Sequence, residues 1–117
     1  MSGLITSLSH DVLVIDFAET RILDQETVHA VEAELTRIAE DAEQDKILID
    51  MNRIELMTSM MIGEFIKFNT RCKELDKRVM FCNLTSQITE LFRITRLDTI
   101  MEMGGSREEA LNLLNNS

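Results

Sequence analysis

The chain has 117 residues, of which 44% are hydrophobic and 28% are charged, and this composition is typical of a globular protein in water. Its 12 Lys and Arg against 21 Asp and Glu give a net charge of −9, which repels phosphate backbones and anionic lipid head groups. Trp and Tyr, which stack on bases, are absent. We therefore expect no nucleic acid partner and no membrane partner.

The length suits a single domain over residues 1–117, because a globule of this size buries roughly two thirds of its extended surface. No apolar run approaches the ~20 residues of a membrane span, and residues 1–10 lack the basic and apolar regions of a secretory signal, so we expect a cytoplasmic location. Cys72 and Cys82 have neither CxxC nor CxxH spacing and are predicted to be small buried hydrophobes.

The first predicted elements are two strands and a helix. Residues 4–8 form a weak strand candidate, and a polar turn at residues 9–11 joins it to the aliphatic run at residues 11–17, which predicts an edge hairpin. A helix then opens near Asp24, a residue type that favours the N-cap position. Its buried stripe has spacings of three and four and comprises Val28, Val31, Leu35, Ile38 and Ala42. Acidic residues on its other face are expected in solvent, namely Glu32, Glu40 and Glu43.

The middle of the chain predicts two further strands around a second helix. Residues 46–51 and 77–84 are short, nearly continuous aliphatic runs, the pattern of strands that are covered on both faces. Between them lies a helical stripe of Met61, Phe65, Phe68, Cys72 and Leu75. The order of strands and helices indicates a mostly parallel sheet.

The last third predicts two helices and an extended piece. A third helix follows Ser86, and its apolar face comprises Ile88, Leu91, Phe92 and Thr95. Two glycines end an extended piece at residues 101–103, after which Ser106 and Glu109 form a capping box. The whole pattern predicts an α/β fold with a mostly parallel sheet of four to five strands, an N-terminal edge hairpin and about four helices.

Motifs of catalysis are absent from the sequence. It contains no glycine-rich phosphate loop and no GxSxG elbow, and His10 and His29 have no second ligand at a metal spacing, so no cofactor, metal or catalytic group is expected. Asp16 and Asp50 end strands, where receiver-like domains hold Mg²⁺. A receiver-like signalling domain that uses Asp50 is therefore one alternative, although no clear lysine accompanies it.

Four motifs in order resemble those of a known family. The sequence reads "DMN" at residues 50–52, "TSMMIG" at 58–63, "LTSQI" at 84–88 and "ITRL" at 94–97. These are similar to the "DLS", "DSSGLG", "LSPEV" and "LTGL" of STAS domains, the family of bacterial anti-sigma-factor antagonists, and the likeness covers nearly the whole chain. The same register places Asp24 on the family's "xLD" before the first helix.

The resemblance implies a binding module and not an enzyme. Family members bind an anti-sigma factor with an ATP-binding serine kinase fold, which phosphorylates the first serine of "DSSGLG", and a PP2C-like phosphatase reverses this step in partner switching. That serine corresponds to Ser59 here. Partner contacts are expected around it from Asp24, Met57, Thr58, Met60 and Glu64.

The motif departs from the family pattern in three places. Thr58 replaces the aspartate, and Met60 and Met61 replace the second serine and the first glycine. The first alternative is accordingly a STAS scaffold or interaction subunit of a signalling complex that is not phosphorylated. Arg96 stands where the family has glycine, which predicts a different turn after the third helix. A weak homodimer is compatible with all of these functions.

Physical chemistry gives Ser59 a plain role and a regulated one. At the first turn of a helix it is expected to cap backbone N–H groups, and Met61 to fill the core. A phosphate on Ser59 adds about −1.5 to −2 charges, and the helix dipole favours it by only about 0.3–1 kcal/mol, so the fold should persist. Burying the same charge unpaired in an interface costs several kcal/mol, so phosphorylation should act on docking.

Overall fold

The computed structural model describes residues 3–116 and confirms the predicted fold class. A five-stranded sheet has the order β1-β2-β4-β6-β7, in which β1 is antiparallel to β2 and the remaining neighbours are parallel. Its strands are β1 (Leu4–Ser9), β2 (Val12–Phe17), β4 (Lys46–Asp50), β6 (Arg78–Cys82) and β7 (Glu102–Gly104). The hydrophobic runs at the centre are therefore the parallel strands, as expected for strands with both faces covered.

The N-terminal hairpin turns more tightly than predicted. His10 and Asp11 have positive φ angles of 48° and 71°, which is the conformation of a two-residue type I′ turn. Ser9, assigned to the turn from the sequence, pairs with Val12 and ends β1. The tight turn keeps all six residues of β1 paired along β2.

A second, two-stranded sheet was not predicted. It consists of β3 (Arg21–Ile22) and β5 (Leu56–Met57), which run parallel with Ile22 opposite Met57. Each strand has only two residues, so no hydrophobic period is visible in the sequence. This small sheet lies just before the two longest helices and determines how they begin relative to each other.

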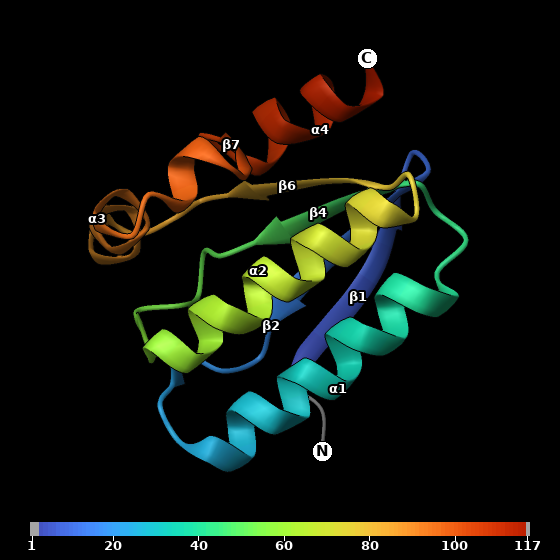
Figure 1. Cartoon of the computed structure of the whole chain (residues 1–117). Helices are drawn as coiled ribbons and strands as arrows, with labels where there is room; N and C mark the ends of the chain where they lie inside the picture. The colour runs from blue at the N-terminus through green and yellow to red at the C-terminus, as the bar shows by residue number, and fades with distance from the viewer. Residues whose placement is uncertain (1–2, 117) are drawn as a thin grey trace.

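Helices cover both faces of the main sheet. They are α1 (Gln25–Asp41), α2 (Ser59–Glu74), α3 (Ser86–Ile94) and α4 (Arg107–Asn115), with a 3-10 turn, η1, at Leu97–Thr99. Figure 1 shows α1 and α2 side by side over one face, whereas α4 lies with β7 at the far side of the sheet. None of the helices in residues 3–116 combines the length and the apolarity that crossing a membrane requires.

The larger core lies beneath α1 and α2. Four aromatic rings cross it edge to face, with centroids 5.3 to 6.1 Å apart, and belong to Phe17, Phe65, Phe81 and Phe92. On the other face of the sheet a smaller cluster lies beneath α4, where Ala110 and Leu114 pack against side chains of β2, β4 and β6. A Cβ on Gly104 would approach that of Ala110 to 3.0 Å, so the close contact of β7 with α4 depends on glycine.

The predicted helix starts are confirmed at both ends of the chain. Asp24 caps α1, and its Oδ2 accepts a bond of 3.0 Å from the N–H of Thr27. Ser106 caps α4 by accepting from the N–H of Glu109, whose carboxylate in turn accepts from Gly105. The capping box therefore reaches one residue further back than the usual motif.

The acidic face of α1 is exposed as predicted at Glu40 and Glu43. Glu40 also forms an ion pair with Arg71 of α2, and Glu32, which is partly buried, forms one with Lys67. The prediction for Arg96 is wrong. Arg96 does not change the turn after α3. It adopts the left-handed conformation, with φ 62°, that glycine usually supplies, and its N–H donates to the carbonyl of Arg93.

Candidate functional site: the surface around Ser59

The small sheet brings the starts of α1 and α2 together. The N–H of Glu55 donates to the carbonyl of Thr20 at 2.8 Å, and the N–H of Thr58 donates to that of Ile22 at 3.1 Å. Ile22 lies opposite Met57 in a parallel register. Asp24 and Ser59 each come two residues after this pair. Each then enters its own helix, so the two N-terminal ends share one edge of the molecule.

Ser59 is the first residue of α2 and is exposed. The predicted N-cap role is wrong, because Thr58 occupies the cap position with extended backbone. The Thr58 side chain makes no cap bond, and its Oγ1 is buried without a hydrogen-bond partner in residues 3–116. Of the two adjacent hydroxyls, Ser59 is thus the one that a second protein can reach.

Three exposed apolar residues at the small sheet and the start of α2 form an apolar rim near Ser59. Met60 is 43% exposed. Leu23, which follows β3, and Leu56, the first residue of β5, are exposed to a similar degree. Sequence reasoning missed both leucines, although an isolated Leu beside a turn was the available signal. We call the group Leu23, Asp24, Leu56, Ser59 and Met60 the Ser59 surface.

Besides Thr58, whose hydroxyl is buried, two residues predicted to contact a partner do not belong to the Ser59 surface. Met57 is only 9% exposed and, like the fully buried Met61, packs in the larger core. Glu64 lines the groove between α1 and α2, and its carboxylate pairs with Lys67 of its own helix at 3.4 Å. Neither side chain is therefore part of the exposed area next to Ser59, whereas Met60 is 43% exposed there.

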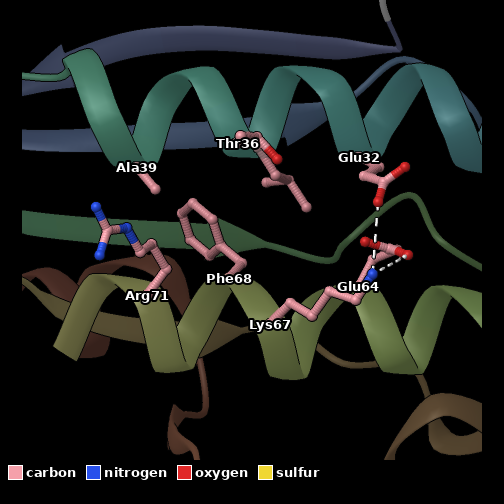
Figure 2. Close-up of a pocket in the computed structure, with 8 residues that line it drawn as sticks. Glu32, Thr36, Ala39, Glu64, Lys67, Phe68 and Arg71 are labelled. Carbon is pink, nitrogen blue, oxygen red and sulfur yellow. Dashed lines mark hydrogen bonds and ion pairs between the residues drawn. The ribbon is translucent and has the colours of Figure 1, made fainter. Parts of the chain in front are cut away.

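Figure 2 shows the groove between α1 and α2 into which Glu64 points. Lys67 reaches across it and also pairs with Glu32 of α1 at 3.5 Å. The hollow has a volume of about 110 Å³, and Phe68 and Ala39 contribute its apolar wall. Two exposed ion pairs, Lys67 with Glu32 and Arg71 with Glu40, therefore bridge the groove between α1 and α2.

Asp24 adds an exposed carboxylate at the start of α1, two residues after the strand pair that Ser59 also follows. Its Oδ1 accepts from the hydroxyl of Thr27 at 2.7 Å, in addition to the N–H bond at Oδ2. These bonds, first that of the Thr27 hydroxyl, hold the pKa of Asp24 below its ordinary value. Asp24 is therefore ionised at neutral pH and gives this edge of the Ser59 surface a fixed negative charge.

Asp50, the centre of the receiver-like alternative, is in a different environment. Its carboxylate is buried and accepts from Nε of Arg107 at 2.7 Å and from Nδ2 of Asn83 at 3.1 Å. Arg107 also bonds to Asp16, which places its guanidinium between the two carboxylates, and the bond to Asp50 is the first cause that raises the pKa of Arg107. A phosphodonor therefore has no free path to Asp50.

The two thiols are buried, as predicted. Burial raises the pKa of Cys72 to about 11 and that of Cys82 to about 12. Within residues 3–116 no three His, Cys, Asp or Glu side chains converge as metal ligands would. The exposed hydroxyl of Ser59, with its apolar rim and one fixed carboxylate, remains the constellation with the clearest potential for recognition.

Comparison with known proteins identifies the family. The model of the STAS domain matches residues 6–110, which is most of the chain and includes Asp24, Ser59 and Arg107. No curated protein sequence matches the chain significantly. The match confirms the resemblance that the four sequence motifs indicated.

Solved structures with the same fold carry related descriptions. An anti-sigma-factor antagonist (STAS) domain protein from Planctomyces limnophilus is 20% identical, with a TM-score of 0.84 over 97% of this chain and 98% of that chain. An anti-sigma factor antagonist from Mycobacterium paratuberculosis is 15% identical, with a TM-score of 0.84 over 96% and 92%. The unphosphorylated form of the anti-sigma factor antagonist SpoIIAA is 16% identical, with a TM-score of 0.73 over 97% and 99%. At these identities the likeness shows the shared fold.

Proposed function

Because the chain belongs to the STAS domain family, we propose that it is an anti-sigma-factor antagonist whose docking is controlled by phosphorylation of Ser59. In this proposal the unphosphorylated form binds an anti-sigma factor with an ATP-binding serine kinase fold, and a sigma factor is released. The kinase ends the interaction by phosphorylating Ser59. A PP2C-like phosphatase then restores the binding form, in the cytoplasm, and the chain itself catalyses nothing.

The observation that carries the proposal is the exposed hydroxyl of Ser59 at the start of α2. A kinase must reach its acceptor, and the neighbouring Thr58 hydroxyl is buried. The rim of Leu23, Leu56 and Met60 offers apolar area around the acceptor, which suits a protein partner. SpoIIAA, a structural relative, has been solved in both a phosphorylated and an unphosphorylated form, which supports modification as a mode of control in this fold.

The position of Ser59 also explains how a phosphate can act without unfolding the chain. At the first residue of a helix the added charge meets the positive end of the dipole, which favours it by about 0.3–1 kcal/mol. When a partner covers the site, the same charge loses water beside the ionised Asp24, and this costs several kcal/mol. Each ~1.4 kcal/mol lowers affinity tenfold, so phosphorylation should reduce docking by orders of magnitude.

Incubation with the cognate anti-sigma kinase and ATP, followed by intact mass spectrometry, tests the proposal. Wild type should gain one phosphate and then lose affinity for the kinase, whereas Ser59→Ala should gain none and keep binding. Thr58→Val is the matched control, because it removes the adjacent hydroxyl and should still gain one phosphate.

Each other outcome has a clear meaning. If Ser59→Ala gained a phosphate, or if Thr58→Val gained none, Thr58 and not Ser59 would be the acceptor. Tight binding without any gain of mass on wild type would contradict control at Ser59 and favour the alternative of a scaffold subunit. The Met60 and Met61 substitutions in the motif are the features on which that alternative is based.

A further inference from the structure

Strand β1 leaves an unusual edge on the main sheet. It is the first strand in the sheet order, and its six residues, Leu4–Ser9, contain no ionisable side chain. Ile5 is 53% exposed and Leu8 is 64% exposed. Edge strands usually carry charges, proline or bulges that block pairing with another chain. The opposite edge follows this rule, because β7 has three residues and its Glu102 pairs with Arg78.

The ladder with β2 shows which backbone groups of β1 point outward. The N–H of Ala18 donates to the carbonyl of Gly3 at 2.8 Å, so this pair is a hydrogen-bonded one. Because bonded pairs alternate along an antiparallel ladder, Ile5, Ser7 and Ser9 also turn their groups toward β2. Thr6 and Leu8 therefore turn theirs outward, and no residue in the described range 3–116 pairs with them.

A hollow lies beside the outward-facing part of β1. It has a volume of about 210 Å³ and opens between the hairpin and the second half of α1. Thr6 and Leu13 line its sheet side, and Ile38 and Ala42 line its helix side. Arg37 and Asp41, of opposite charge, also contribute to its wall. The hollow is therefore partly apolar and lies on the same face of the sheet as the exposed side chain of Leu8.

We propose that β1 is an interface for a second copy of this chain, which pairs antiparallel to it about a two-fold axis at Ser7. In this register Thr6 lies opposite the second copy's Leu8, and the outward N–H and C=O groups of both residues bond to each other. The two-fold axis repeats the pair, so four N–H···O bonds join the sheets. The two five-stranded sheets become one continuous sheet.

The register makes the strand complementary to itself. Directly opposite residues on an antiparallel pair have Cβ atoms about 4.5–5.5 Å apart and share one face of the sheet. The second copy's Leu8 therefore lies over Thr6, at the mouth of the hollow, and the two-fold axis places Leu8 over the second hollow in return. One strand supplies both the projecting side chain and the hollow that receives it, which is why a second copy is the expected occupant.

Charge and position agree with this arrangement. The net charge of −9 opposes association at long range, but the paired segment adds no charge, and each hollow has one cation and one anion at its wall. Added salt screens the long-range repulsion and should favour the dimer. Leu8 adjoins the hairpin turn, at the end of the sheet where β4 begins, whereas Ser59 follows the end where β4 ends. The interface therefore leaves the Ser59 surface open and does not depend on the proposed function.

Sedimentation equilibrium of the full chain tests the proposal. The weight-average mass should rise from 13.4 kDa toward twice that value as concentration increases, and it should rise at lower concentration when salt is added. Leu8→Lys places a charge at the hollow and should leave a monomer at every soluble concentration. Thr6→Pro removes only an outward N–H, which an edge strand tolerates, and should weaken the dimer at least tenfold.

Ile94→Lys is the matched control, because Ile94 is exposed to a similar degree, at 69% against 64% for Leu8, but lies on α3. It should dimerise like wild type. Circular dichroism and urea unfolding of each variant establish that the fold is intact. A monomeric wild type at high salt would overturn the proposal, as would a dimer that survives unchanged in both Leu8→Lys and Thr6→Pro.

Discussion

Nε of Arg107 donates to Oδ2 of Asp50 across 2.7 Å, which links the first residue of α4 to the last residue of β4. The Asp50 side chain is completely buried, and Arg107 is partly exposed. Asn83, in the left-handed conformation after β6, donates to the same carboxylate. The buried charge is thus satisfied by groups from three separate elements of the fold, because the N–H of Asn52 also donates to it.

Arg107→Met should lower the free energy of unfolding by about 3 kcal/mol, because it leaves a buried carboxylate without its cation. Arg107→Lys should lower it less, since one charged donor remains. Urea unfolding at neutral pH measures both effects. Equal stability of wild type and Arg107→Met would show that Asn83 and the Asn52 N–H satisfy Asp50 alone.

Thr58→Val should raise the free energy of unfolding by about 1 kcal/mol, because it removes a buried hydroxyl that lacks a partner. Threonine at an N-cap is ordinarily worth keeping, but this side chain makes no cap bond. Thermal and urea unfolding measure the change. A loss of stability would mean that the hydroxyl of Thr58 is satisfied in solution.

Thr27→Val should raise the pKa of Asp24, because the Thr27 hydroxyl is the largest cause that lowers it. A lowered pKa in the folded state contributes stability above the unfolded value of about 3.9, and this contribution is lost as pH falls through the folded pKa. Acidification should therefore destabilise wild type more than Thr27→Val. An NMR titration of the Asp24 carboxyl measures the pKa, and an identical value in both proteins would contradict the assignment.

Met60→Ala should weaken binding to the anti-sigma kinase about tenfold, because Met60 supplies exposed apolar area next to Ser59. Leu113→Ala removes a similarly exposed side chain from α4, on the other side of the sheet, and should bind like wild type. Calorimetric titration compares them. An equal loss of affinity in both variants would contradict docking at the Ser59 surface.

Local signals in the sequence predicted most of the fold. Buried strands leave continuous aliphatic runs, and the stripes of α1 and α2 repeat with the helical period, so the sheet and its two covering helices follow from neighbouring residues. Asp24 and Ser106 were predicted as caps because the residue types that cap helices are few. The exposed Ser59 at a helix start came from the motif register.

Features that depend on distant residues were not predictable in this way. The pairing of β3 with β5 joins two-residue segments that are 35 positions apart and show no period. The bond from Arg107 to Asp50 spans 57 positions, and charge pattern alone does not select that partner among the 21 acidic residues. Whether Thr58 or Ser59 is the cap, and thus which hydroxyl is buried, depends on a single residue of helix register.

Because Cys72 in α2 and Cys82 in β6 are deeply buried, the rate at which each thiol reacts can report local unfolding of its element. Their raised pKa values leave very little thiolate at neutral pH, and the surrounding core excludes reagents. A thiol-specific alkylating reagent can therefore label them only during transient unfolding, so the labelling rate reports how often each element opens. Comparison of the two rates would show whether the helix that presents Ser59 detaches before the sheet does.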